Sequence, residues 1–284
     1  MSTGGEDRIF EQEGRPFTGR LNKMLKLFIF VWTCWKLNLA GALEFRLSFF
    51  LTAGMMMINN FVWIFFWSIF FTRFPVVNGW VLEDVMMMWA VSAGGYGLMA
   101  VLFGNTMMMA RLIATGQLDT YLAQPKPVLL HVLVSRMSLS AIGDFVFAIL
   151  IFVFFGDTSF MGILKFILAL LVSALIFLFF ILIAHTLAFY IGNAEGISYQ
   201  LFNCLLAFST YPTDIFHGWG RVVLFTVIPA GFISYLPIGL LRGVQMDFIL
   251  GACGVAAALT VGGIWFFYKG LRRYSSGNMI TMRM

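Results

Sequence analysis

Two titratable side chains lie within long apolar stretches and are the residues best placed to do chemistry. Asp144 lies in "SAIGDFVFAIL" and His185 lies in "ILIAHTLAF". A carboxylate in such surroundings is costly unless it is paired, so Asp144 has two interpretations. Either a partner such as His185 or a nearby basic residue neutralises it, or it belongs to a substrate pathway or a gate. His185 alone is more typical of an interhelical hydrogen bond than of a proton relay.

Other residue patterns do not form a catalytic or metal-binding set. An intramembrane aspartyl protease needs a GxGD and a Tyr-Asp pair, whereas this chain has "AIGD" and no Tyr-Asp. The methionine triplets at 55–57, 86–88 and 107–109 suggest thioether ligands for copper. Adjacent helical residues point about 100° apart, however, so no triplet can converge on one ion. The three cysteines are scattered, and we expect no catalytic residue, no metal site and no cofactor in this chain.

The composition indicates whether water or lipid surrounds the folded protein. Of the 284 residues, 61% are hydrophobic and only 11% are charged, and the mean hydropathy is +0.91. A soluble fold cannot cover so much apolar surface, which excludes a soluble nucleic-acid binder despite the net charge of +5. We therefore expect an all-α integral membrane protein with lipid around it.

Six segments are predicted to span the membrane, because a crossing needs about 20 apolar residues. The fifth is the most polar, but it follows a connector too short for a soluble excursion. Asn59 and Asn60 in the first span are candidates for the pathway, for close helix contacts at a dimer seam, or for packing within the subunit. Ser92, Gly94, Gly95 and Gly97 in the second span are candidates for contacts at that seam or within the subunit. The predicted spans are approximately 47–72, 85–110, 137–156, 163–191, 197–216 and 247–268.

The segment 221–243 is apolar enough for a seventh span, but Pro229 and Pro237 divide it into two short pieces. Lys and Arg concentrate on the cytoplasmic side of short loops. With six spans and a cytoplasmic N-terminus, most of the 18 Lys and Arg residues fall on that side. A seventh span would place the basic C-terminus outside. We therefore expect 221–243 to form a re-entrant hairpin on the external face, between spans five and six.

The ends of the chain are expected to be cytoplasmic. Residues 1–20 are polar and lack the apolar core of a secretory signal. Residues 21–46 hold an apolar run that is too short to cross the membrane, is flanked by lysines and carries two tryptophans. This pattern predicts a helix in the membrane interface that acts as an elbow. Residues 47–272 form the six-span domain, and 273–284 form a short tail.

The loop between spans two and three reads "RLIATGQLDTYLAQPKPVLLHVLVSR" over residues 111–136. A short helix is predicted there, with Leu118 and Leu122 on one face and with Pro125 and Pro127 ending it. A stiff helix of mixed polarity at the cytoplasmic face is typical of a docking element.

This loop resembles that of permease subunits of ABC transporters of the type-2 exporter class, which have a Gly-Thr-Leu-Glu run, a leucine pair and then a proline. The proline-bearing segment 221–243 and the "LEFR" that ends the elbow also resemble this family, most closely a bacterial subfamily whose substrates are largely uncharacterised. Gln117 replaces the usual Thr. The residues that the resemblance assigns to coupling are Gly116, Leu118, Asp119, Tyr121, Leu122 and Pro125.

The resemblance implies a division of labour between subunits. The loop helix would dock on a separate ABC ATPase subunit, which would bind ATP and Mg, and this chain has no GxxxxGK[ST] phosphate loop. A second permease, identical or related, would complete the pathway in the cell (inner) membrane, and export follows from the resemblance alone. The alternative is an ion- or proton-coupled secondary transporter that uses Asp144 and the broken segment 221–243. No nucleic-acid partner is expected.

Overall fold

The computed structural model describes residues 16–192, 194–241 and 246–275, and most of these residues are helical. Within this part of the chain there is no strand, and an isolated bridge between Val77 and Trp80 closes one turn. The all-α prediction is confirmed. Most of the predicted polar N-terminus and tail lies outside the described residues.

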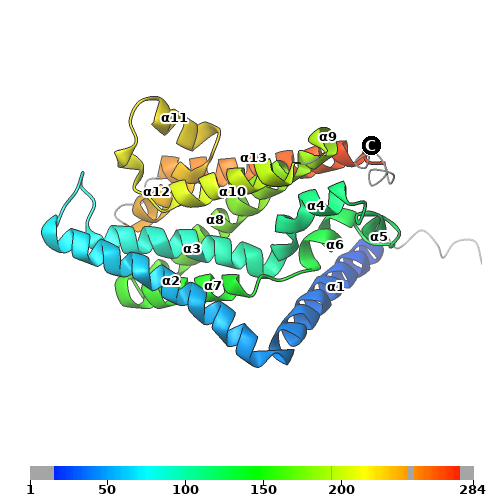
Figure 1. Ribbon diagram of the computed structural model, residues 1–284, viewed down its shortest axis with the longest axis horizontal. Coiled ribbons are helices and arrows are strands. Elements are labelled where there is room, and N and C mark those ends of the chain that lie inside the picture. The colour runs from blue at the N-terminus through cyan, green and yellow to red at the C-terminus, as the bar shows by residue number, and fades with distance from the viewer. Residues whose placement is uncertain (1–15, 193, 242–245, 276–284) are drawn as a thin grey trace, which may run out of the picture.

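Seven long helices make the body of the fold (Figure 1), and shorter elements connect them. The long helices are α1 (Pro16–Glu44), α2 (Arg46–Arg73), α3 (Leu82–Phe103), α7 (Ser140–Phe155), α8 (Phe160–Thr186), α10 (Glu195–Ser209) and α13 (Met246–Leu271). The short ones are η1 (Gly104–Met108), α4 (Met109–Ala114), α5 (Asp119–Leu122), α6 (Val128–Val134), α9 (Ala188–Ile191), η2 (Thr213–Ile215), α11 (Trp219–Thr226) and α12 (Ala230–Leu241).

Five helical segments among the described residues are long and apolar enough to cross a membrane. Four of them coincide with predicted spans, and the fifth lies in the elbow. The sequence prediction that the elbow is too short to cross was therefore wrong on length, because α1 continues through the apolar run to Glu44. The five segments are Lys23–Glu44, Arg46–Arg73, Leu82–Ala114, Phe160–Ile191 and Met246–Leu271.

Two predicted spans form shorter helices than expected. α7 has 16 residues and α10 has 15, which correspond to about 24 Å and 22 Å of helix. α10 ends at Ser209 rather than near 216, because Pro212 disfavours helical backbone in the residue before it. Neither helix alone reaches the length of an ordinary crossing.

The proline-rich segment is a bent helix pair. α11 and the part of α12 that ends at Leu236 meet at 89° across a short break that contains Pro229. The predicted division at Pro229 is confirmed, whereas Pro237 lies within α12 instead of ending it. Residues 242–245, at the end of the predicted hairpin, lie outside the described residues.

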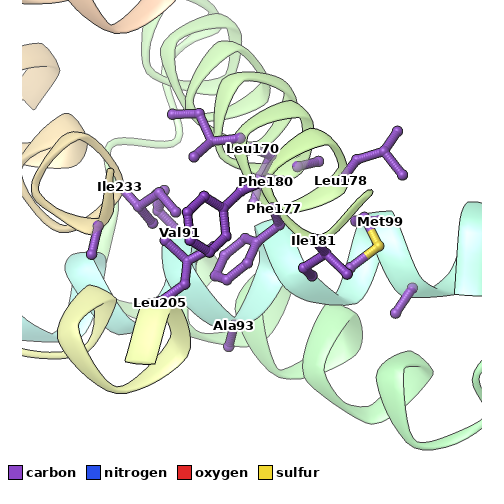
Figure 2. Close-up of a cluster of buried hydrophobic side chains, with 14 of the residues drawn as sticks. Val91, Ala93, Met99, Leu170, Phe177, Leu178, Phe180, Ile181, Leu205 and Ile233 are labelled. Atoms are coloured by element: carbon purple, nitrogen blue, oxygen red, sulfur yellow. The ribbon is translucent and has the colours of Figure 1, made fainter. Parts of the chain in front are cut away.

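The packed interior forms around α3, which contacts α7, α8 and α12, while α13 packs on α8 and α2 packs on α7. Figure 2 shows Phe177 and Phe180 of α8 directed toward Val91 of α3, with Leu205 of α10 and Ile233 of α12 beside them. All these side chains are buried. Since lipid is as apolar as these residues, close packing rather than escape from water holds the helices together.

Small residues allow the close approach of α3 to its neighbours. A Cβ on Gly97 would lie 2.7 Å from the Phe145 backbone nitrogen, and one on Gly94 would lie 2.6 Å from the Ala148 Cβ. Ser92 and Gly95 are also buried inside the bundle. These residues therefore make contacts within the subunit, which was one of their two interpretations.

The first two helices form a V beside the bundle (Figure 1), with the turn at Phe45 as its apex. α2 lies along α7, whereas α1 runs from the apex toward α5 and α6. The apolar part of α1 from Lys23 onward is not buried within the subunit. Its apolar side chains are therefore available to lipid or to another chain.

Candidate functional site

The loop 111–136 folds as α4, α5 and α6 at one end of the bundle, here called the α5 end. Gly116 lies in the turn between α4 and α5 with a φ of +75°, a backbone conformation that favours glycine. The expected helix is shorter than predicted, because α5 contains only Asp119–Leu122. It ends three residues before Pro125, and Pro127 precedes the first residue of α6.

The two leucines of the loop have different surroundings. Leu118 is fully buried and belongs to the main hydrophobic core, whereas Leu122 is 40% exposed. The prediction that both leucines share one docking face is therefore wrong. Leu118 anchors the loop to the bundle, and the exposed residues form a continuous segment, 122–127, which includes Leu122, Pro125 and Lys126.

Polar and aromatic contacts hold α5 against α6. The Tyr121 hydroxyl is 3.1 Å from the Ser135 hydroxyl, and the Tyr121 ring meets the His131 ring edge to face at 5.0 Å. Ser135 also accepts a hydrogen bond from the Asn105 side chain in η1. Tyr121 thus faces the bundle, and the sequence could not distinguish this orientation from a docking orientation.

The elbow helix α1 is tied to the same loop. The Trp35 indole donates to the Leu102 carbonyl at 2.8 Å, and the Asn38 amide donates to the Val134 carbonyl at 3.0 Å. Phe30 packs edge to face on His131 at 5.2 Å. Burial, and to a smaller extent the Lys126 ammonium, lower the pKa of His131, which favours its neutral form in this cluster.

The end of the last long helix reaches this loop as well. Tyr274 follows α13 and packs on Phe189 with ring centroids 6.0 Å apart. Burial, together with the adjacent Asp119 carboxylate, raises the pKa of Tyr274 to about 12. Asp119 therefore faces the subunit's own C-terminal segment, and the loop touches both the first and the last long helices.

A second candidate site lies within the bundle, between α2, α3, α7 and α10. Asp144 of α7 is 2% exposed, and its Oδ1 accepts a hydrogen bond of 2.7 Å from the Asn60 amide of α2. Its Oδ2 has no hydrogen-bond partner. These side chains line a cavity of about 380 Å³, the deep cavity, together with Asn59, Ser92 and Tyr96.

His185 is not the partner of Asp144. Its Nδ1 lies 3.4 Å from the Ala110 backbone nitrogen, which donates to it where the second spanning segment changes from η1 to α4. The sequence could not predict this pairing, because the 3₁₀ turn that redirects the backbone is set by tertiary packing. His185 thus makes an interhelical contact, as its more typical interpretation expected, and it does not line the deep cavity.

A larger cavity of about 710 Å³, the outer cavity, adjoins the deep one along α2 and shares Trp63, Trp67 and Tyr211 with it. Its wall is mainly aromatic, and its one carboxylate is satisfied. Asp214 accepts a hydrogen bond of 2.8 Å from the Trp80 indole, and Arg221 lies 3.9 Å away. The two cavities, together called the hollow, adjoin at these three side chains, and the Asp144 Oδ2 at the deep cavity has no hydrogen-bond partner among the described residues.

Sequence reasoning missed most of this wall. Trp63, Trp89, Tyr96 and Tyr211 each resemble ordinary apolar span residues, and Asn203 resembles a packing residue. A signal was available in the tryptophans at 63 and 67 of the first span, since aromatic side chains are expected near the membrane interfaces rather than at mid-span. Their alignment with Asp144 depends on the helix rotations, which only packing sets.

A metal centre is not formed by the part of the chain that the structure describes, since no cluster of three His, Cys, Asp or Glu residues occurs there. The methionine triplet at 86–88 is buried in the hydrophobic core, where it packs against other apolar side chains. The described site residues therefore lie in two places, the exposed segment 122–127 and the hollow that Asp144 lines.

Comparison with known proteins agrees with this layout. Searches of curated proteins and of solved structures found no match. A family model described as "ABC-2 family transporter protein" matches residues 57–277. That range covers most of the chain and includes the loop 111–136, Asp144 and the bent pair of α11 and α12. The chain therefore belongs to the ABC-2 transporter family, as a multi-pass membrane component of such a transporter.

Proposed function

We propose that this chain is the permease subunit of an ATP-driven exporter, coupled through its 111–136 loop to separate ABC ATPase subunits. ATP and Mg bind on those partners. Membership of the ABC-2 family supports the ATPase partnership. Export, the identity of the contact surface and the composition of the complex are the parts that the proposal adds.

One observation carries the proposal: the exposed segment 122–127 is mounted on a rigidly held base. Leu118 is buried in the core, and Tyr121 contacts Ser135. Asp119 lies close enough to Tyr274, beyond the end of α13, to raise the pKa of its hydroxyl. A surface fixed at several points moves with the helices behind it, so a push on 122–127 is transmitted to α1, α3 and α13 instead of being lost in a flexible loop.

The proposed topology has six crossings with both termini in the cytoplasm of a bacterial cell. The α5 end is cytoplasmic, α1 lies in the interface as an elbow, and α11 with α12 forms a re-entrant hairpin on the external side. Its 89° bend suits a hairpin better than a crossing. The short helices α7 and α10 are accommodated by local thinning of the bilayer, which costs only fractions of a kcal/mol per Å.

The proposed complex contains two permeases, identical or related, in the cell membrane. The substrate passes along the seam between them, and the hairpin with Pro229 and Pro237 closes its external end. The exposed apolar surface of α1 and α2 supports a partner of this kind, since it offers Phe50, Phe61 and Phe65 for helix contacts as well as for lipid.

The test is purification of the tagged chain with its native partners, followed by measurement of bound ATPase subunit and of ATP turnover. The variant combines Leu122→Ala, Gln124→Ala and Lys126→Ala, which changes only exposed side chains. We expect this variant to remain folded, to lose most of the bound ATPase and to lose turnover. Leu118→Ala is unsuitable, because loss of a buried leucine costs about 2–5 kcal/mol of stability by itself.

The matched control is Leu43→Ala in α1, since Leu43 has the same 40% exposed fraction as Leu122. This control is expected to retain both the ATPase and the turnover. Undiminished turnover in the triple variant would refute the coupling role of 122–127. Transport that survives depletion of ATP but stops with an uncoupler would instead identify an ion-coupled transporter that uses Asp144.

A further inference from the structure

We propose that the deep and outer cavities together bind an aromatic or otherwise bulky apolar organic cation, with its positive charge at Asp144. This inference rests on the proposed transport function, of which it names the class of cargo. The deep end of the hollow supplies the negative charge, and the wall supplies the apolar contact area.

The charge at the deep end lacks a counter-ion in the part of the chain that the structure describes. Asp144 is only 2% exposed, and the side chain that bonds to it among the described residues is the neutral amide of Asn60. Neither cavity is lined by a described Lys or Arg, and Arg221 lies 3.9 Å from Asp214, which lines the outer cavity. A ligand cation would provide the missing partner for Oδ2.

The wall is suited to the rest of such a ligand. Trp63 and Trp89 stack with their ring centroids 5.7 Å apart, and Trp67 packs edge to face on Tyr211 at 6.5 Å. Aromatic faces attract cations as well as apolar surfaces, and tryptophan does so most strongly. The cavities of about 380 Å³ and 710 Å³ are in the range that drug-sized ligands occupy, roughly 300–1,000 Å³.

The two carboxylates of the hollow, Asp214 and Asp144, differ in the partners that the protein gives them. Asp214 is held by Trp80 and Arg221 at the outer end, so its charge is already neutralised by the protein. Asp144 is bonded on one oxygen only, and Asn60 fixes the direction in which the second oxygen points. Selectivity for cations should therefore depend on Asp144 and hardly on Asp214.

The experiment uses two ions of nearly the same shape and opposite charge, tetraphenylphosphonium and tetraphenylborate. Binding of each radiolabelled ion is measured to the full-length chain in lipid nanodiscs at pH 7.5, and binding to empty nanodiscs is subtracted. We expect saturable binding of tetraphenylphosphonium and none of tetraphenylborate. Asp144→Asn should weaken tetraphenylphosphonium binding at least tenfold, whereas Asp157→Asn, an exposed carboxylate in the turn before α8, should leave it unchanged.

A second pair of variants covers the case in which Asp144→Asn does not fold. Trp63→Leu removes a ring shared by both cavities and should weaken binding of the cation several-fold. Trp265→Leu removes an exposed ring from α13 that lines neither cavity, and it should have no effect. Equal binding of the two ions, or undiminished cation binding in Asp144→Asn, would overturn the proposal.

This measurement needs neither ATP nor an ATPase subunit. Failure of cation binding with intact ATP turnover would reject the cargo class and leave the proposed function standing. Cation binding by a chain that copurifies with no ATPase would support the cargo class and reject the proposed coupling to an ATPase.

Discussion

The interface between α3 and α8 and the hollow bounded by α2, α3, α7 and α10 treat buried polar groups differently. In the first, Ser173 of α8 donates to the Val91 carbonyl of α3, so its hydroxyl binds one helix to the next. In the second, the Asp144 Oδ2 and the indole nitrogens of Trp67 and Trp89 have no partner. The α3–α8 interface is here called the scaffold, and the region around the hollow is called the open side.

The packing of the two sides differs in the same way. Gly94, Gly95 and Gly97 bring α3 into backbone contact with α7 and α8. On the other side, the rings of Trp63 and Trp67 in α2 and of Tyr211, which follows α10, line both the deep and the outer cavity. A close-packed scaffold can transmit movement from the α5 end, whereas a hollow can change volume at small cost.

The largest effect is expected from overpacking the scaffold at Gly97. In Gly97→Ala the new Cβ would lie 2.7 Å from the Phe145 nitrogen and 2.9 Å from the Ala141 carbonyl oxygen, so α3 and α7 must separate. We expect a loss of about 1–3 kcal/mol of stability. Thermal unfolding of the purified chain in detergent measures it.

The control for this variant is Gly254→Ala in α13, where a Cβ would meet no atom within 4 Å. Alanine has the better helix propensity, so this variant should be unchanged or more stable by up to about 1 kcal/mol. If both variants unfold at the wild-type temperature, the tight α3–α7 contact does not contribute to stability.

A smaller effect is expected at the polar pair of the open side. Asn60→Ala removes the side-chain hydrogen bond that Asp144 accepts among the described residues and should cost about 1–2 kcal/mol. Asp144→Asn should cost almost nothing, because an amide can still bond to Asn60 and no charge is then buried. In the Asp144→Asn background, Asn60→Ala should therefore cost less than it does alone.

Unfolding of the two single variants and of the double variant gives this coupling energy directly. Equal costs for Asn60→Ala in both backgrounds would mean that the hydrogen bond to the carboxylate adds no stability. The open side would then resemble the scaffold, and the contrast between the two sides would rest on packing alone.

The sequence predicted the elements better than it predicted their contacts. Long apolar runs identified α2, α3, α8 and α13, because a span needs only length and hydropathy. Pro229 correctly marked the break between α11 and α12. The lengths of α7 and α10 were overestimated, since hydropathy does not register where a tertiary turn ends a helix.

The pairing of the site residues could not be predicted from the sequence. Asp144 and His185 were both correctly identified as unusual, but the rotation of α7 places Asp144 against Asn60 and leaves His185 to a backbone nitrogen. Similarly, i, i+4 spacing placed Leu118 and Leu122 on one face. The left-handed turn at Gly116 and the single-turn length of α5 instead separate them into a buried and an exposed residue.

The smallest effect is expected from titration of His131, which joins the loop to the scaffold through α1. The pKa of His131 is lower in the folded protein than in the unfolded chain, so the contribution of its neutral form is complete above the ordinary value of about 6.5. That contribution is lost as the pH falls through this value toward the folded pKa, because the unfolded state then binds more protons.

Acidification from pH 7.5 to 5.5 should therefore loosen the cluster of Phe30, Tyr121 and His131 at the α5 end. Hydrogen exchange in residues 118–135 should quicken at pH 5.5, after correction for the intrinsic pH dependence of exchange. His131→Phe retains the ring contacts and removes the titrating group, so its protection in this segment should not change with pH. A pH response of equal size in the variant would show that a group other than His131 loosens the loop. The contacts that connect segment 122–127 to the scaffold would then lie outside the cluster of Phe30, Tyr121 and His131.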